Sequence, residues 1–218
     1  MTTEMTGKLI TLEGGEGAGK STVLDALRKR LAAHGIDVVV TREPGGTAAG
    51  EAIRTLLLDP QRHGGMCAEA ELLLMFASRA QLVREIVRPA LAAGRWVLSD
   101  RFTDASFAYQ GGGRAQPDER IADLESWAAA GLTPDLTLLL DLPVAAGLAR
   151  ARGRGPADRM EMEGNDFFER VRATYRARAA REPGRFRVID ASAPLDAVLA
   201  EVDRALAAFL AAPGGAAA

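Results

Sequence analysis

The segment Gly14–Ser21 restricts the fold of this chain more than any other part of its sequence. It satisfies the pattern G-x-x-x-x-G-K-[ST], follows the apolar run Leu9–Glu13 and precedes apolar residues at helical spacing. Glycines here let the backbone curl so that successive N–H groups point inward, beside the positive end of the following helix. The segment therefore predicts a strand, a phosphate-binding loop and a helix that together bind a nucleoside triphosphate.

The residues of this loop have individual expected contacts with the nucleotide. The Lys20 ammonium is expected to reach the β- and γ-phosphates, and the Ser21 hydroxyl is expected to ligate Mg²⁺. Glu16 is unusual, because an acid inside a phosphate-binding loop is expected to point away from the nucleotide. The residues expected to bind ATP are Gly14, Gly15, Glu16, Gly17, Ala18, Gly19, Lys20, Ser21 and Thr22.

Short β-rich runs alternate with longer stretches of helical period along the whole chain. The predicted strands are Leu9–Glu13, Asp37–Thr41, Trp96–Asp100, Leu136–Leu142 and Phe186–Asp190. This alternation is typical of a parallel sheet covered on both faces, so we expect a P-loop NTPase-type three-layer α/β fold with a five-stranded parallel sheet flanked by helices. Ligands of such sheets bind beyond the carboxyl ends of the strands.

Length and charge limit the organisation of the chain. No repeat or long linker interrupts the alternation, so residues 1–218 are predicted to form a single domain, with a frayed tail at 211–218. The formal net charge of −2 argues against a protein that mainly holds nucleic acid. Cys67 is the only cysteine, which excludes an intrachain disulfide and argues against a zinc site.

The expected location of the chain is the cytoplasm, with no membrane partner. The first residues lack the apolar stretch of a secretory leader, and no run of 18 apolar residues occurs.

A phosphate-binding loop does not by itself identify a reaction, because GTPases, motor ATPases and small kinases all contain one. No lysine occurs beyond Lys29, so a guanine-reading Asn-Lys-x-Asp motif is absent. A kinase for a small acceptor remains as the main interpretation. A deoxynucleoside acceptor, another nucleotide, or a slowly hydrolysing regulator that acts through a partner are the alternatives.

Several further motifs carry a resemblance to a known family. They are Glu13–Thr22, the string T-R-E-P-G-G-T at Thr41–Thr47, Asp100-Arg101, the string A-Y-Q-G-G-G at Ala108–Gly113, Pro134–Thr137 and the arginine-rich segment Arg150–Arg159. Together these motifs resemble bacterial thymidylate kinases over nearly the whole chain. The resemblance implies phosphorylation of dTMP to dTDP by ATP and Mg²⁺ within dTTP synthesis, by direct transfer, in a homodimer.

The resemblance also implies where dTMP binds. Phe76 and Arg79 share a helical face and are expected to hold the thymine, although Phe76 considered alone is more typical of a core residue. Arg101 is expected to clamp the monophosphate, because a guanidinium fork suits a phosphate. The other expected contacts are Arg42 to the acceptor phosphate, Tyr109 and Glu16 beside the sugar, and Ser106 and Gln110 along the base and sugar pocket.

Metal and catalytic residues are expected from the same motifs. Asp100 and Glu43 are predicted to orient Mg²⁺ with Ser21, and Pro44 is expected to form a rigid turn whose peptide bond is compatible with the cis form. Since the loop offers no cation beyond Lys20, the segment 150–159 is predicted to be a lid whose arginines neutralise the transferring phosphoryl group. Arg154 is the favoured finger, followed by Arg152 and Arg159, and Gly111–Gly113 is expected to be a backbone bend.

Overall fold

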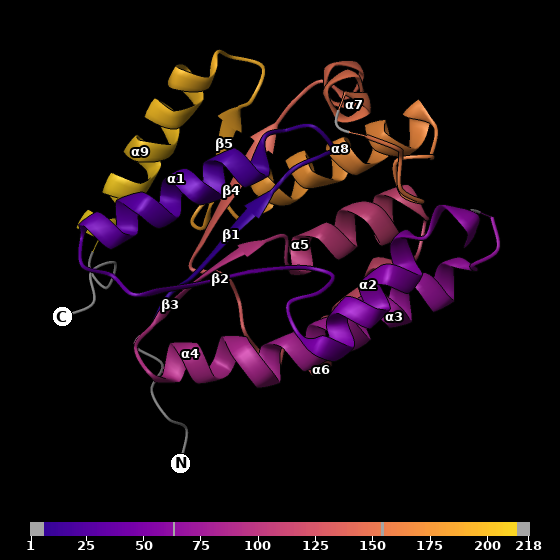
Figure 1. The fold of residues 1–218 in the computed structure, drawn as a ribbon, viewed down its shortest axis with the longest axis horizontal. Helices are drawn as coiled ribbons and strands as arrows, with labels where there is room; N and C mark the ends of the chain where they lie inside the picture. The colour runs from indigo at the N-terminus through magenta and orange to yellow at the C-terminus, as the bar shows by residue number, and fades with distance from the viewer. Residues whose placement is uncertain (1–6, 63, 154, 213–218) are drawn as a thin grey trace.

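The computed structural model describes residues 7–62, 64–153 and 155–212 of the chain. At its centre lies a sheet of five parallel strands in the order β2-β3-β1-β4-β5 (Figure 1). The strands are β1 (Leu9–Glu13), β2 (Val38–Arg42), β3 (Trp96–Asp100), β4 (Leu136–Asp141) and β5 (Phe186–Asp190). The predicted five-stranded parallel sheet is confirmed, and the predicted strand bounds differ from the observed ones by at most one residue at either end.

Helices cover both faces of this sheet (Figure 1). On one face α1 (Lys20–Ala33) and α9 (Leu195–Ala211) pack over Ile10 and Leu12 of β1. On the other face, the continuous helix α3 (Ala68–Leu82), η2 (Val83–Val87) and α4 (Arg88–Ala92) packs over Leu9. Side chains alternate between the faces of a strand, so the apolar run of β1 contributes to both layers.

The remaining helical segments complete the structure around the sheet, and the last of them packs against β4 and β5. They are α2 (Ala48–Leu58), η1 (Pro60–Arg62), α5 (Thr103–Ser106), η3 (Phe107–Gly113), α6 (Asp118–Ala128), α7 (Val144–Arg152) and α8 (Asn165–Arg181). No helix in the described ranges combines the length and apolar composition that a bilayer span requires. Of the expected tail at 211–218, residues 213–218 lie outside the described part of the chain.

The expectation of a backbone bend at Gly111–Gly113 is wrong. These glycines continue the π-helical segment η3, which packs against α8. A Cβ atom at Gly112 would overlap Thr174, and one at Gly113 would lie 2.6 Å from Cζ of Phe167. Arg170 also donates hydrogen bonds to the Gly112 and Gly113 carbonyl oxygens at 3.0 and 2.9 Å. The glycines therefore allow close approach of two helices, and η3 carries Tyr109 and Gln110.

Candidate active site

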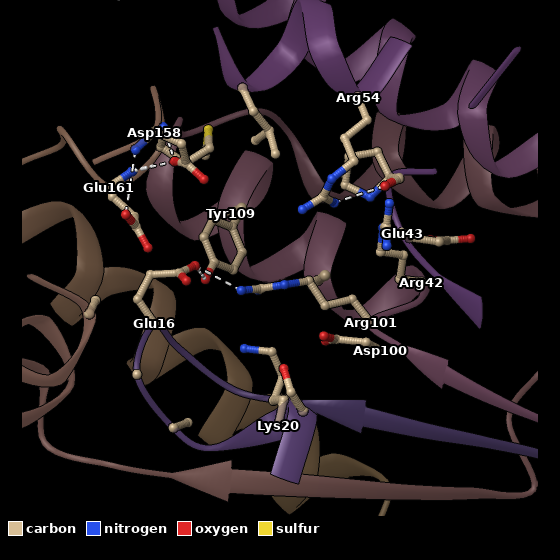
Figure 2. Close-up of a pocket in the computed structure, with 18 of the residues that line it drawn as sticks. Glu16, Lys20, Arg42, Glu43, Arg54, Asp100, Arg101, Tyr109, Asp158 and Glu161 are labelled. Atoms are coloured by element: carbon tan, nitrogen blue, oxygen red, sulfur yellow. Dashed lines mark hydrogen bonds and ion pairs between the residues drawn. The ribbon is translucent and has the colours of Figure 1, made fainter. Parts of the chain in front are cut away.

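A cavity of about 680 Å³ opens at the carboxyl ends of the strands. The phosphate loop after β1, the segments after β2 and β3, and the helices α2, α5 and η3 all contribute side chains to it (Figure 2). Parallel strands bring their carboxyl ends to one edge, and register pairs both Leu12 and Arg42 with Asp100. Residues as far apart in the sequence as Glu16 and Glu161 therefore meet around one space, and fifteen of the predicted site residues line it.

The loop after β1 has the backbone that its sequence predicts. Gly14, Gly17 and Gly19 have positive φ values of 138°, 68° and 90°. A Cβ atom at Gly14 would lie 2.5 Å from the Leu140 carbonyl oxygen, so a larger residue does not fit there. Lys20 begins α1, and its ammonium donates to the Gly14 and Gly15 carbonyl oxygens at 3.1 and 3.0 Å.

Lys20 is partly buried within the site. Burial and the nearby charge of Arg101 lower its pKa from the ordinary value. An anionic ligand would oppose both effects, because its negative charge favours the protonated amine. The position and the electrostatics of Lys20 thus suit contact with a phosphate.

The side chains of Arg101 and Tyr109 both bond to Glu16 of the phosphate loop within the cavity (Figure 2). Nη2 of Arg101 lies 2.7 Å from Oε1 of Glu16, and the Tyr109 hydroxyl donates to the same oxygen at 2.8 Å. Burial raises the pKa of the Tyr109 phenol well above its usual range, so this hydroxyl remains a donor. The Glu16 carboxylate lines the cavity and lies beside Arg101 and Tyr109, two residues that the resemblance assigns to the acceptor.

Arg79 is buried at the side of the cavity, and several acceptors hold its guanidinium. Its Nε donates to Oε2 of Glu43 at 2.7 Å, Nη1 donates to Ser106 at 3.0 Å, and Nη2 donates to the Phe102 carbonyl oxygen at 3.0 Å. Burial raises the pKa of Glu43, and the Arg79 charge opposes this shift. The guanidinium is therefore fixed in one orientation at the cavity surface.

Phe76 does not reach the cavity. It is 3% exposed, packs with Leu72, Phe107 and Ile121, and supports the Arg79 guanidinium 4.6 Å from its ring centroid. Met75, the preceding residue, lines the cavity instead. In this conformation Phe76 has the core environment that its sequence position alone suggests.

Arg54 is a cavity residue that the sequence analysis missed. It donates to the Pro44 carbonyl oxygen at 2.9 Å, next to the cis Glu43-Pro44 peptide bond and to Arg42, which pairs with Glu51 at 2.8 Å (Figure 2). Helical spacing was the available signal: Glu51, Arg54 and Leu58 stand at i, i+3 and i+7 after the Thr47 N-cap, on one face of α2.

Comparison with known proteins shows the family to which this chain is related. The family model for thymidylate kinase matches residues 12–202. The chain is 57% identical over 202 residues to the thymidylate kinase of Pseudomonas putida strain GB-1, covering 93% of this chain and 96% of that protein. It belongs to the thymidylate kinase family.

Further relatives agree with this assignment. The chain is 56% identical over 206 residues to the thymidylate kinase of Ectopseudomonas mendocina strain ymp, covering 94% of this chain and 98% of that protein. The crystal structure of thymidylate kinase from Ehrlichia chaffeensis superposes with a TM-score of 0.75 at 30% identity, covering 92% of this chain and 98% of that one. The resemblance noted from the motifs is confirmed, and the chain is a phosphotransferase of this kinase family.

The arginines expected in the lid of this thymidylate kinase family member lie in different environments. Arg150 lines the cavity and donates to the Ala191 carbonyl oxygen at 3.0 Å. Arg152 ends α7, exposed and outside the cavity lining, and Arg154 lies outside the described residues. Arg159 is 2% exposed and pairs with Glu71 at 2.6 Å, so the structure does not bring it to the cavity.

The carboxylate of Glu71 explains the position of Arg159. It is buried and also accepts from Gln110 Nε2 at 3.0 Å and from Arg114. Burial opposes its ionisation, but hydrogen bonds from Arg114, Gln110 and Arg159 hold the pKa of Glu71 below its ordinary value. Arg159 therefore neutralises a buried charge and anchors the end of the segment 150–159 beside Gln110.

Two residues of the cavity, one after Lys20 and one at the end of β3, offer oxygen atoms that suit a divalent cation. Ser21 and Asp100 line the cavity, and Oδ1 of Asp100 is buried without a hydrogen-bond partner among the described residues. Within the same ranges no group of three acidic, histidine or cysteine residues could enclose a metal. This donor set fits Mg²⁺, which keeps several waters and is held by one or two protein oxygens together with substrate phosphates.

Proposed function

We propose that this thymidylate kinase family member transfers the γ-phosphoryl group of ATP to dTMP and releases dTDP and ADP. One observation carries the proposal: Lys20 of the phosphate loop and the guanidinium of Arg101 line the same cavity, and Arg101 pairs with Glu16 of that loop at 2.7 Å (Figure 2). A phosphate oxygen of dTMP attacks the γ-phosphorus, and the bond from that phosphorus to the bridging oxygen of ADP breaks. Catalysis then depends on positioning and charge stabilisation, without a covalent intermediate.

The two ends of the cavity divide between donor and acceptor. The loop amides and Lys20 bind the β- and γ-phosphates of ATP, as P-loops do. Arg101 binds the acceptor phosphate, with Arg42 and Arg54 adding positive charge from β2 and α2. This division follows from the geometry, because the acceptor must approach the γ-phosphate from the side opposite ADP.

The nucleoside of dTMP lies along η3. Tyr109 packs beside the sugar where a 2′-hydroxyl would otherwise sit, and Glu16 accepts a hydrogen bond from the 3′-hydroxyl. Arg79, Ser106 and Gln110 surround the thymine, with Arg79 held rigidly by its bonds to Glu43 and Phe102. Phe76 contributes to thymine binding indirectly, because its ring packs against the Arg79 guanidinium.

Ser21 and Asp100 would hold Mg²⁺, and Glu43, whose Oε1 has no hydrogen-bond partner in the described ranges, would assist them. When bound, Mg²⁺ offsets the negative charge of the ATP phosphates. The oxygen of Ser21 is suited to this role because it is the second residue of α1, next to the loop that binds those phosphates.

Residues 150–159 act as a lid that excludes water and supplies positive charge to the transferring group. Arg154 is the favoured arginine finger and Arg152 is the second candidate. The burial and ion pair of Arg159 instead favour an anchoring role at the end of the lid.

A homodimer is supported by apolar side chains that one copy leaves exposed. Leu73 on α3 is 58% exposed and Trp127 on α6 is 72% exposed, and these two helices pack together. The cytoplasm is the proposed location, because ATP and dTMP are available there.

The test is ADP release by the purified chain with ATP and Mg²⁺. The acceptors are dTMP, thymidine, dUMP, CMP and none. We expect turnover with dTMP, and a loss of about 100-fold or more in kcat/KM for dTMP in Arg101→Ala. Arg204→Ala, an exposed arginine on α9, is the matched control and should keep wild-type activity. Turnover with thymidine but not dTMP, or ADP release without any acceptor, would refute the proposal.

A further inference from the structure

The backbone of Arg101 is held in an unfavourable conformation. Its φ angle of 72° lies in the left-handed region, which residues with a side chain rarely adopt. Such a conformation persists only where the surrounding structure holds it, and it often marks a functional position. This turn directs the guanidinium away from β3, over the Tyr109 ring at 4.7 Å and toward Glu16.

Hydrogen bonds hold both peptide groups that flank the Arg101 Cα atom. Arg101 N–H donates to the Leu12 carbonyl oxygen at 2.9 Å, as an extension of the β1–β3 pairing. The Ser99 hydroxyl donates to the Arg101 carbonyl oxygen at 2.7 Å. The next amide, Phe102 N–H, donates to Oε1 of Glu13 at 2.7 Å. Two of these three bonds depend on side chains, so they can be removed by substitution.

Glu13 and Ser99 are buried behind this turn. They are 0% and 1% exposed, and neither lines the cavity that Arg101 enters. The second oxygen of Glu13 accepts from the Tyr175 hydroxyl on α8 at 2.7 Å. A buried carboxyl group costs free energy unless its polar atoms are hydrogen-bonded, and here Oε1 accepts from the amide after Arg101.

We propose that Glu13 and Ser99 are positioning residues for dTMP binding: they hold the left-handed turn that aims the Arg101 guanidinium at the acceptor phosphate. The proposal rests on the proposed role of Arg101 as the phosphate clamp. Both residues act through the backbone, without contact with either nucleotide. Tyr175 fixes the Glu13 carboxylate in the orientation that reaches Phe102 N–H.

A double-mutant cycle on dTMP affinity tests this proposal. The variants are Ser99→Ala, Glu13→Leu and Glu13→Gln, each alone and combined with Arg101→Ala. The dissociation constants of dTMP and of a non-hydrolysable ATP analogue are measured by calorimetry, and weak binding is measured by NMR titration. Direct binding is measured because it gives dissociation constants for variants that have lost activity as well.

Loss of either hydrogen bond should weaken dTMP binding when Arg101 is present. We expect Ser99→Ala and Glu13→Leu to raise the dTMP dissociation constant about 5- to 30-fold, the usual size of coupling within one hydrogen-bond network. Combined with Arg101→Ala, the same substitutions should change it by less than about twofold. Glu13→Gln keeps an oxygen that can accept from Phe102 N–H, so it should restore most of the affinity lost in Glu13→Leu.

The controls separate positioning from a general effect on folding. Binding of the ATP analogue should stay within about twofold of wild type in the single variants. An equal loss of dTMP affinity with and without Arg101, or a matching loss for the ATP analogue, would overturn the positioning role. If Glu13→Leu does not fold, Ser99→Ala decides the outcome. If Arg101→Ala alone binds dTMP normally, the proposed clamp fails first, which is a distinct result.

Discussion

At the residue scale, two Arg–Glu pairs near the cavity differ in burial and therefore in expected energy. The Arg79–Glu43 pair has side chains that are 2% and 5% exposed, with a shortest distance of 2.6 Å. The Arg42–Glu51 pair has a similar distance of 2.8 Å, but its side chains are 52% and 43% exposed. Water screens the second pair, whereas removal of one partner from the first leaves an uncompensated buried charge.

We expect Arg79→Ala to lower the free energy of unfolding by about 3–5 kcal/mol, because Glu43 would lose its cation. Arg42→Ala is the matched control and should lower it by less than about 1 kcal/mol. Urea denaturation of both variants measures the difference. Equal effects of the two substitutions would contradict the argument from burial.

At the element scale, the packing of η3 against α8 sets the position of the side chains of η3 that line the cavity. Gly112 and Gly113 lie where η3 meets Thr174 and Phe167 of α8, and two residues of the same element, Tyr109 and Gln110, line the cavity. A change in the distance between these helices would therefore move cavity side chains.

We expect Gly113→Ala to lower the free energy of unfolding by about 1–3 kcal/mol, because the added Cβ would overlap the Phe167 ring. It should also raise KM for dTMP more than KM for ATP, since Tyr109 and Gln110 would shift. The control is Gly184→Ala, where an added Cβ meets nothing within 4 Å. An unchanged stability in Gly113→Ala would show that η3 and α8 are not packed as closely as described.

Also at the element scale, the ion pairs of the buried Glu71 hold the end of the lid segment 150–159. Arg159→Ala removes one of its cations while Arg114 remains, so we expect a loss of about 3 kcal/mol in unfolding free energy. Arg152→Ala changes an exposed residue and should alter stability by less than about 0.5 kcal/mol. Thermal or urea unfolding compares the two, and a stable Arg159→Ala enzyme with a large loss of kcat would instead favour Arg159 as the finger.

At the scale of the whole molecule, Glu13 lies where β1, the turn after β3 and α8 meet. Burial and the negative charge of Asp104 raise its pKa from 4.5 to about 8, against the opposing effects of Tyr175, Arg101 and Phe102 N–H. The folded chain therefore retains a proton that the unfolded chain releases between these two pH values. The contribution of this group to stability is greatest below pH 4.5 and falls as the pH rises to about 8.

We expect wild-type stability to decrease more between about pH 5 and about pH 9 than the stability of Glu13→Gln, which cannot ionise. Urea unfolding at both pH values gives the two differences, and other titrating groups cancel in the comparison. Glu119→Gln, an exposed carboxylate on α6, should retain the wild-type dependence. Parallel pH profiles for wild type and Glu13→Gln would contradict a raised pKa.

The sequence alone determined the sheet, the phosphate loop and the family, because these depend on local patterns. Apolar runs of strand length, glycines with positive φ, and a lysine at a helix start each act within a few residues. These features depend on residues close together in the sequence, so the strands and the loop could be placed to within one residue.

Only the tertiary structure decided which side chains face the cavity and which are buried beside it. Phe76 and Arg159 match expected motif positions, yet one packs in the core and the other neutralises Glu71. Arg54 and the support of Arg101 by Glu13 were not anticipated, because they join residues 10 and 89 positions apart. Burial, ion pairing and backbone strain are properties of groups brought together by folding, and local sequence patterns do not contain them.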